Sequence, residues 1–94
     1  MTSRSRLTDD QVSERLAVVS GWSRVDDSIS KTFDAPSFME GIAFVQSVAE
    51  IAESTDHHPD IDIRYTHVTL TLSTHDMGGL TGLDFEVAEA INAL

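Results

Sequence analysis

The sequence predicts an α+β fold in which a four-stranded antiparallel sheet carries helices packed on one face. Three segments begin with a capping pattern and continue with apolar residues at helical spacing, while four other segments read as strands. Their order is α-β-β-α-β-β-α, so that pairs of strands lie between helices. This order is typical of an antiparallel sheet packed against helices. The 94 residues fit one domain and leave no room for a second.

The first helix is predicted to begin after Thr8. The hydroxyl of this threonine can cap the helix, and Gln11 can return the hydrogen bond from the third helical position. The apolar stripe that follows is Val12, Leu16 and Val19. Gly21 marks the predicted end of the helix. The first two strands are then expected at 22–25 and 29–33, on either side of a polar turn.

The second helix is predicted over residues 37–54, where Ser37 and Glu40 repeat the capping pattern. One apolar stripe of this helix consists of Phe38, Ile42, Val45, Ala49 and Ala52. A second apolar edge consists of Phe44, Val48 and Ile51. A helix that is apolar beyond one stripe needs a second surface to pack against. We therefore expect self-association through this helix.

The last two strands are predicted from alternation of apolar and polar residues. The apolar positions are Ile61, Ile63 and Tyr65 in one strand and Val68, Leu70 and Leu72 in the next. The third helix follows, with Thr81 as its cap and Asp84 at its third position. A carboxylate there also suits the positive end of the helix dipole. The helix stripe continues with Phe85, Ala88 and Ile91.

Composition and charge exclude several classes of function. The formal net charge is −10, whereas nucleic-acid binders need a basic surface, so we expect no direct nucleic-acid partner. The same charge repels anionic membranes, and no apolar run is long enough for a secretory signal or a bilayer span. The chain has no cysteine, which excludes disulfides and thiolate chemistry. We expect a cytoplasmic protein with a flexible tail over 1–6 and one domain over 7–94.

All four histidines lie between His57 and His75. Histidine is the side chain whose ordinary pKa lies near physiological pH, so a cluster of histidines indicates proton chemistry. Pro59 disfavours helix at the preceding residue, so the second helix must end near 55–56 and leave His57 and His58 in a loop. His75 follows the last strand. If the last two strands form a hairpin, the three histidines meet at one end of the sheet.

A series of residues at fixed spacing covers this region. It reads Glu53-x3-His57-His58-Pro59-x5-Tyr65-x9-His75-x8-Asp84. The series resembles the signature of the pterin-4a-carbinolamine dehydratases, also known as the dimerisation cofactor of a hepatocyte nuclear factor. The stretches 72–75 and 79–81 resemble the second site loop of that family. Trp22, Phe33 and Phe38 agree with its upstream pattern.

The resemblance implies a 4a-hydroxytetrahydrobiopterin dehydratase. Such an enzyme is a hydro-lyase that removes water from a pterin 4a-carbinolamine, gives quinonoid dihydropterin and so recycles tetrahydrobiopterin. The pterin is the substrate, and neither a cofactor nor a metal is implied. The resemblance also implies a homodimer or homotetramer that associates through the 37–54 helix and the sheet edge.

The resemblance also implies roles for residues. The positions that it places at the pterin are His57, His58, Pro59, Thr74, His75, Asp76 and Met77. His57 and His75 are the acid–base candidates, and His58 positions the pterin or supports proton transfer. Residues 74–77 are expected to bond the amide edge of the pterin, with Glu53 and Asp84 in support. The resemblance leaves open which histidine is the acid and which is the base.

Alternatives stay open at this point. Ile61 stands where some family members carry tryptophan, and the absence of a tryptophan wall would loosen pterin binding. His58 and His75 could share a zinc ion, but adjacent histidines are poorly placed to bind one ion and no helix carries a His-x3-His pair. There are two other hypotheses: a pterin-binding protein without turnover, and a protein-dimerising module. Affinity for several pterins would separate the first of these from an enzyme, and the assembly state of a Phe44→Asp variant tests the second.

Overall fold

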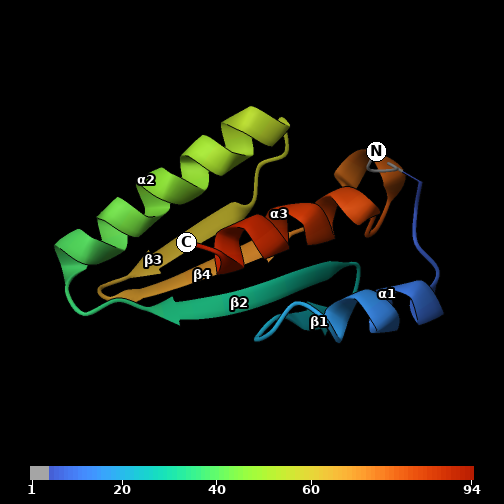
Figure 1. Ribbon diagram of the computed structural model, residues 1–94, viewed down its shortest axis with the longest axis horizontal. Coiled ribbons are helices and arrows are strands. Elements are labelled where there is room, and N and C mark those ends of the chain that lie inside the picture. Colours follow the sequence, from blue (N-terminus) through green and yellow to red (C-terminus); the bar gives the residue numbers. More distant parts are fainter. Residues whose placement is uncertain (1–4) are drawn as a thin grey trace.

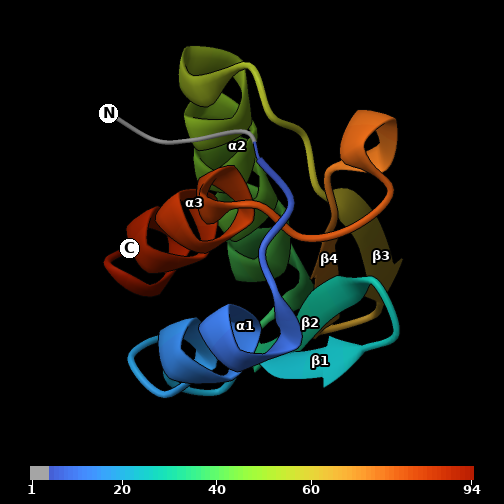
Figure 2. The ribbon, with the colours of Figure 1, turned by 90° about the vertical axis from the view of Figure 1, so that its right-hand side faces the viewer.

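Three helices lie on one side of a four-stranded antiparallel sheet (Figure 1, Figure 2). The computed structural model describes residues 5–94. The elements are α1 (Asp9–Leu16), β1 (Ser23–Val25), β2 (Ser28–Asp34), α2 (Phe38–Thr55), β3 (Asp60–Arg64), β4 (His67–Leu72), the short 3-10 helix η1 (His75–Met77) and α3 (Gly82–Asn92). The predicted fold class and order of elements are confirmed.

The sheet has the order β1-β2-β4-β3, so the two central strands are not consecutive in the chain. β2 pairs with β4 from Ile29 opposite Leu72 to Asp34 opposite His67. The predicted hairpin of β3 with β4 is confirmed. The long connection through α2 lets the two hairpins lie beside one another, and the pairing of β2 with β4 joins them into one sheet.

The core lies between the sheet and the helices. Its fully buried members include Val12, Val19, Ile29, Val48, Val68, Leu70, Leu72, Phe85, Val87 and Ile91. Trp22 is also buried, and its indole Nε1 donates to Asn92 Oδ1 at 3.0 Å. Lys31 Nζ donates to the same oxygen at 2.9 Å. These bonds attach the end of α3 to β2 and to the segment that precedes β1.

The predicted capping patterns form as hydrogen bonds. The Thr8 hydroxyl accepts from the Gln11 amide, and the Gln11 side chain accepts from the Thr8 amide. The Ser37 hydroxyl accepts from the amide of Glu40. Thr81 and Asp84 form a second complete capping box. Each cap involves residues only two or three positions apart, which is why a local pattern was sufficient to predict it.

The predicted end of the first helix at Gly21 was wrong, because α1 ends at Leu16. The amides of Val18 and Val19 bond to carbonyls three residues back, which closes the helix in tight turns and places Val19 in the core. Gly21 then turns the chain toward β1 with a φ of +85°. The glycine serves this turn rather than the helix terminus.

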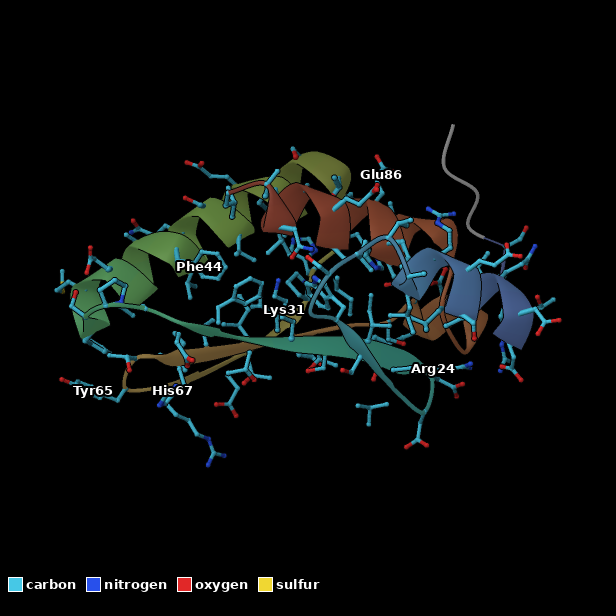
Figure 3. The ribbon with its side chains drawn as sticks, turned by 60° about the horizontal axis from the view of Figure 1, so that its bottom comes forward. Arg24, Lys31, Phe44, Tyr65, His67 and Glu86 are labelled. Carbon is cyan, nitrogen blue, oxygen red and sulfur yellow. The ribbon has the colours of Figure 1, made fainter. Side chains whose placement is uncertain are left out.

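The predicted outward-facing apolar edge of α2 was also wrong. Val48 is fully buried, and Phe44 packs on Phe33 with ring centroids 4.8 Å apart. Figure 3 shows Phe44 directed from α2 toward the sheet. α2 contacts both β4 and α3, so its second apolar edge is satisfied within the same chain.

The exposed apolar residues lie elsewhere. Ile61 and Ile63 of the edge strand β3 are 40% and 38% exposed, and Phe38 and Met39 at the start of α2 are 46% and 72% exposed. The alternation in β3 had predicted a half-buried strand. As an edge strand it has only one neighbour, β4, and all five of its residues are exposed.

The face of the sheet opposite the helices is polar. Three cross-strand pairs between β2 and β4 hydrogen-bond there: Ser30 with Thr71, Thr32 with Thr69, and Asp34 with His67. This face therefore needs no helix to cover it. Among residues 5–94, no helix has both the length and the apolarity that crossing a bilayer requires.

The predicted tail over residues 1–6 falls mostly outside the described residues, which begin at Ser5. Arg6 forms an isolated antiparallel bridge with Thr81. The amide of Leu7 donates to the carbonyl of Leu80 at 2.8 Å. The segment before α1 thus lies against the start of α3, and the domain boundary at residue 7 stays a prediction.

Candidate active site

The loop that carries the adjacent histidines begins at a left-handed residue. Asp56 caps α2 with φ 50° and ψ 43°, and its amide bonds to carbonyls of the last helical turn. The next amide, that of His57, donates to Ala52 O at 3.1 Å. This turn reverses the chain directly after α2, and Pro59 keeps the loop extended before β3. The predicted end of the second helix is confirmed.

The turn sends the two imidazoles to different environments. His57 is buried, with 7% of its surface exposed, and its Nε2 lies 2.6 Å from Asp84 Oδ1. His58 is exposed, and its Nε2 lies 2.5 Å from Oε2 of Glu53, in the last turn of α2. The sequence placed both histidines in one loop. The structure adds that one is held inside the protein and the other lies at its surface.

Asp84 is the centre of a buried hydrogen-bond network. It is fully buried at the third position of α3. Its Oδ1 faces His57, and its Oδ2 accepts from the Thr74 hydroxyl at 2.7 Å and from the Thr81 amide at 3.0 Å. One carboxylate thereby connects the loop after α2, the segment after β4 and the first turn of α3. Asp84 has both the capping position predicted for it and a contact with a histidine.

His75 lies on a small closed loop. The amides of Thr74 and Gly79 each donate to the other residue's carbonyl, which ties the two ends of the loop together. Gly78 closes the turn with a φ of +69°, a conformation that favours glycine. His75 is exposed, and its side chain makes no hydrogen bond with other described residues. Its imidazole is therefore free to contact a ligand.

His75 also lines a surface hollow of about 340 Å³. The other lining residues are Val25, Asp26, Asp27, Ser28, Asp60, Thr71 and Ser73. Asp60 follows Pro59 directly, so His75 lies next to the strand that the histidine loop enters. No pattern in the sequence marks Asp60 or the β1–β2 turn as part of this site. Only the pairing of β2 with β4, which no local pattern signals, brings that turn to this end of the sheet.

The remaining predicted site residues lie around these histidines. Pro59 is half-buried in the loop, while Asp76 and Met77 are exposed in η1. Thr74 is 1% exposed, and its hydroxyl bonds to Asp84 and Thr81 inside the protein. In the described part of the chain, no three histidine, aspartate or glutamate side chains lie close enough together to bind one metal ion.

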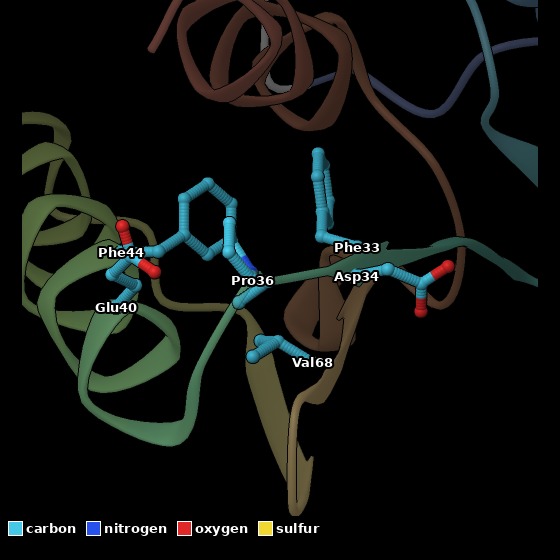
Figure 4. Close-up of a pocket in the computed structure, with 7 residues that line it drawn as sticks. Phe33, Asp34, Pro36, Glu40, Phe44 and Val68 are labelled. Atoms are coloured by element: carbon cyan, nitrogen blue, oxygen red, sulfur yellow. The ribbon is translucent and has the colours of Figure 1, made fainter.

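A further histidine–carboxylate pair and a second hollow lie away from this region. His67 pairs with Asp34 at the far end of β4, and Figure 3 shows it beside Tyr65 below the sheet. A second hollow of about 200 Å³ lies near the start of α2 and contains no histidine. Its largest lining side chains, Phe33 and Phe44, are apolar, and Figure 4 shows the Asp34 carboxylate directed away from both rings.

Known sequences match this chain over almost its whole length. A profile of the family described as pterin 4 alpha carbinolamine dehydratase matches residues 5–94. A protein of Roseiflexus castenholzii is 54% identical over 88 residues, which cover 94% of this chain and 95% of that protein. A protein of Mycobacteroides abscessus is 50% identical over 86 residues, with 92% of each chain covered. Both carry the provisional name of pterin-4-alpha-carbinolamine dehydratase.

Two solved structures have a similar fold. A transcriptional coactivator/pterin dehydratase from Brucella melitensis superposes with a TM-score of 0.91 at 36% identity, covering 95% of this chain and 97% of that one. A pterin dehydratase-like protein, identified as a RuBisCO assembly factor in the alpha-carboxysome, superposes with a TM-score of 0.62 at 25% identity. That match covers 77% of this chain and 83% of the other.

Proposed function

This chain belongs to the pterin-4a-carbinolamine dehydratase family, and from that premise we propose that it removes water from a 4a-hydroxytetrahydropterin. The product is a quinonoid dihydropterin, and the physiological role is recycling of tetrahydrobiopterin in the cytoplasm. The pterin is the substrate, and the reaction uses neither a metal nor another cofactor. One observation carries the proposal: a single buried carboxylate, Asp84, links the segments that bear His57 and His75.

The chemistry explains why histidines suit this site. The 4a-hydroxyl must be protonated to leave as water, and the N5 proton must be removed as the C4a–N5 double bond forms. Both transfers favour groups that gain and lose protons near neutral pH. His57, His58 and His75 supply three such groups at one end of the sheet. We expect the exposed residues of η1, Asp76 and Met77, to border a pterin that binds beside His75.

A stopped-flow assay tests this proposal. A freshly generated 4a-hydroxytetrahydropterin is mixed with the wild-type protein, and the rate of water loss is compared with the spontaneous rate in buffer. We expect a rate that increases with protein concentration and saturates with substrate. If the protein leaves the spontaneous rate unchanged, the dehydratase proposal is wrong, and binding of pterin or assembly of a protein partner becomes the better reading.

We also propose that the protein forms homo-oligomers through the β3 edge and the start of α2. β3 leaves one side of its backbone unpaired, and unpaired edges favour pairing with another chain. Ile61 and Ile63 add exposed apolar surface to this edge, and Phe38 and Met39 add more at the start of α2. This surface replaces the edge through Phe44 that the sequence had suggested.

Replacing Ile63 by glutamate is expected to shift the protein toward monomer, since the new charge would be buried between two copies. Size-exclusion chromatography with light scattering measures the change. Val18→Glu is the matched control, because Val18 is 69% exposed in the segment after α1, away from this edge. An unchanged mass for Ile63→Glu would exclude β3 as the contact.

A further inference from the structure

The hydrogen bonds around Asp84 have a direction that can be worked out from donor counts. Thr74 has one hydroxyl proton, and the hydroxyl donates it to Asp84 Oδ2 at 2.7 Å. The Thr81 hydroxyl lies 2.9 Å from the Thr74 hydroxyl, so Thr81 must be the donor in that pair. The Thr81 hydroxyl in turn accepts from the amide of Leu83 at 3.3 Å. In each of these three hydrogen bonds, the acceptor is therefore the group that is nearer to the carboxylate.

This arrangement suits a carboxylate that accepts hydrogen bonds at both of its oxygens. Its Oδ2 receives two donors, the Thr74 hydroxyl and the Thr81 amide, and the carboxylate lies at the N-terminus of α3, where the helix dipole favours negative charge. Hydrogen bonds that are linked in series with the same donor-to-acceptor direction polarise one another, so the last bond, to the carboxylate, becomes stronger. With the carboxylate ionised, the 2.6 Å contact with His57 requires the proton to lie on His57 Nε2.

The other ring nitrogen of His57 is the one left for chemistry. Nδ1 makes no hydrogen bond with the described residues. Every fully buried side-chain nitrogen and oxygen among those residues has a partner, so Nδ1 must reach solvent although the residue as a whole is 7% exposed. In the neutral ring with Nε2 protonated, Nδ1 carries the lone pair and accepts a proton.

We propose that Thr74 is a positioning residue, which acts through Asp84 to hold His57 as the Nε2–H tautomer with Nδ1 as the proton acceptor of the site. The inference rests on the proposed dehydratase function and assigns the base in it. Nδ1 takes the N5 proton, the N5–H electron pair forms the C4a–N5 double bond, and the C4a–O bond breaks. The departing oxygen takes a proton from one of the two exposed histidines, His58 or His75, and leaves as water.

This role differs from the pterin contact that the sequence suggested for the Thr74 side chain. With 1% of its surface exposed, the residue has no free hydroxyl for a ligand. Its hydroxyl supplies one of the two donors to Asp84 Oδ2. Without that donor the carboxylate is held less firmly in place, and its contact with His57 Nε2 is weakened. The Nε2–H tautomer of His57 then loses its advantage over the Nδ1–H tautomer.

The test combines Thr74→Val, which removes the hydroxyl at nearly constant shape, with Thr74→Ser, which keeps it. Long-range ¹H–¹⁵N NMR spectra of the neutral imidazoles, recorded without substrate, report which nitrogen of His57 carries the proton. We expect the Nε2–H form in wild type and Thr74→Ser, and a mixture or the Nδ1–H form in Thr74→Val. Dehydration kinetics should show kcat reduced about 10–100-fold in Thr74→Val, with KM little changed and activity restored by serine.

Thr69→Val is the control, because its hydroxyl bonds to Thr32 at 2.8 Å on the sheet face opposite the helices. It should change neither the His57 spectrum nor kcat. A wild-type His57 in the Nδ1–H form overturns the proposal, and so does a Thr74→Val variant with wild-type tautomer and kcat. The spectra need no turnover. A wild type that shows the expected tautomer but no dehydration would therefore refute the enzyme function while retaining the positioning role.

Discussion

Replacing His75 by alanine is expected to lower kcat/KM for dehydration by about 10²–10⁴-fold, the usual contribution of a general acid or base. The fold should not change, because the imidazole is exposed and makes no hydrogen bond with other described residues. Surface substitutions of this kind change stability by about 0.5 kcal/mol or less. Stopped-flow rates measure the first effect, and urea unfolding followed by Trp22 fluorescence measures the second.

His67→Ala is the matched control for this experiment. His67 is also an exposed histidine, but it pairs with Asp34 at the opposite end of β4. Its replacement should leave dehydration at the wild-type rate. Equal losses in the two variants would mean that exposed histidines act through a general effect such as net charge. An active His75→Ala variant would remove His75 from the mechanism.

Replacing Asp84 by alanine is expected to lower the free energy of unfolding by about 3–5 kcal/mol, because the substitution removes the acceptor of several buried hydrogen-bond donors. The carboxylate is fully buried and accepts from three groups: His57 Nε2, the Thr74 hydroxyl and the Thr81 amide. Alanine would leave these donors inside the protein without their acceptor. Each buried donor without a hydrogen-bond partner lowers the free energy of unfolding by about 1–3 kcal/mol. The capping box of α3 would also be lost. Urea denaturation measures the change.

Glu53→Ala provides the comparison, because the chain contains a second histidine–carboxylate pair of similar length. The Glu53–His58 contact is 2.5 Å, against 2.6 Å for Asp84–His57, but its side chains are 76% and 56% exposed. Exposed pairs contribute between about 0 and 1 kcal/mol, so the loss should be within about 1 kcal/mol. If both variants lost the same stability, burial would not be what distinguishes the two pairs.

Much of the fold was predictable because the signals are local. Thr8, Ser37 and Thr81 cap helices through residues two or three positions away, and such bonds depend on little beyond the adjacent chain. Pro59 ended the second helix for a similarly local steric reason. The order of helices and strands follows from these starts and from the alternation in β4, where every second residue is fully buried.

Other predictions failed where contacts far apart in the chain decide the outcome. The apolar edge of α2 through Val48 indicated an intermolecular surface, but α3 and β4 use that edge inside the same chain. The length of α1 was overestimated because Val19 continues the helical spacing, although it is buried from a turn that follows the end of the helix at Leu16. Periodicity reports that a residue will be buried, but not which segment will bury it.

At the site too, local signals in the sequence and contacts between distant segments determine different things. The sequence by itself determined which residues could carry proton chemistry: the positions of His57, His58 and His75 follow from Pro59 and from the hairpin of β3 and β4. Only the tertiary structure decided their environments. It buried His57 against Asp84, left His58 with Glu53 in solvent and turned the Thr74 hydroxyl inward. Burial and hydrogen-bond direction depend on how α3 docks between the two loops. That docking is set by packing across the whole core, which no segment of the chain encodes alone.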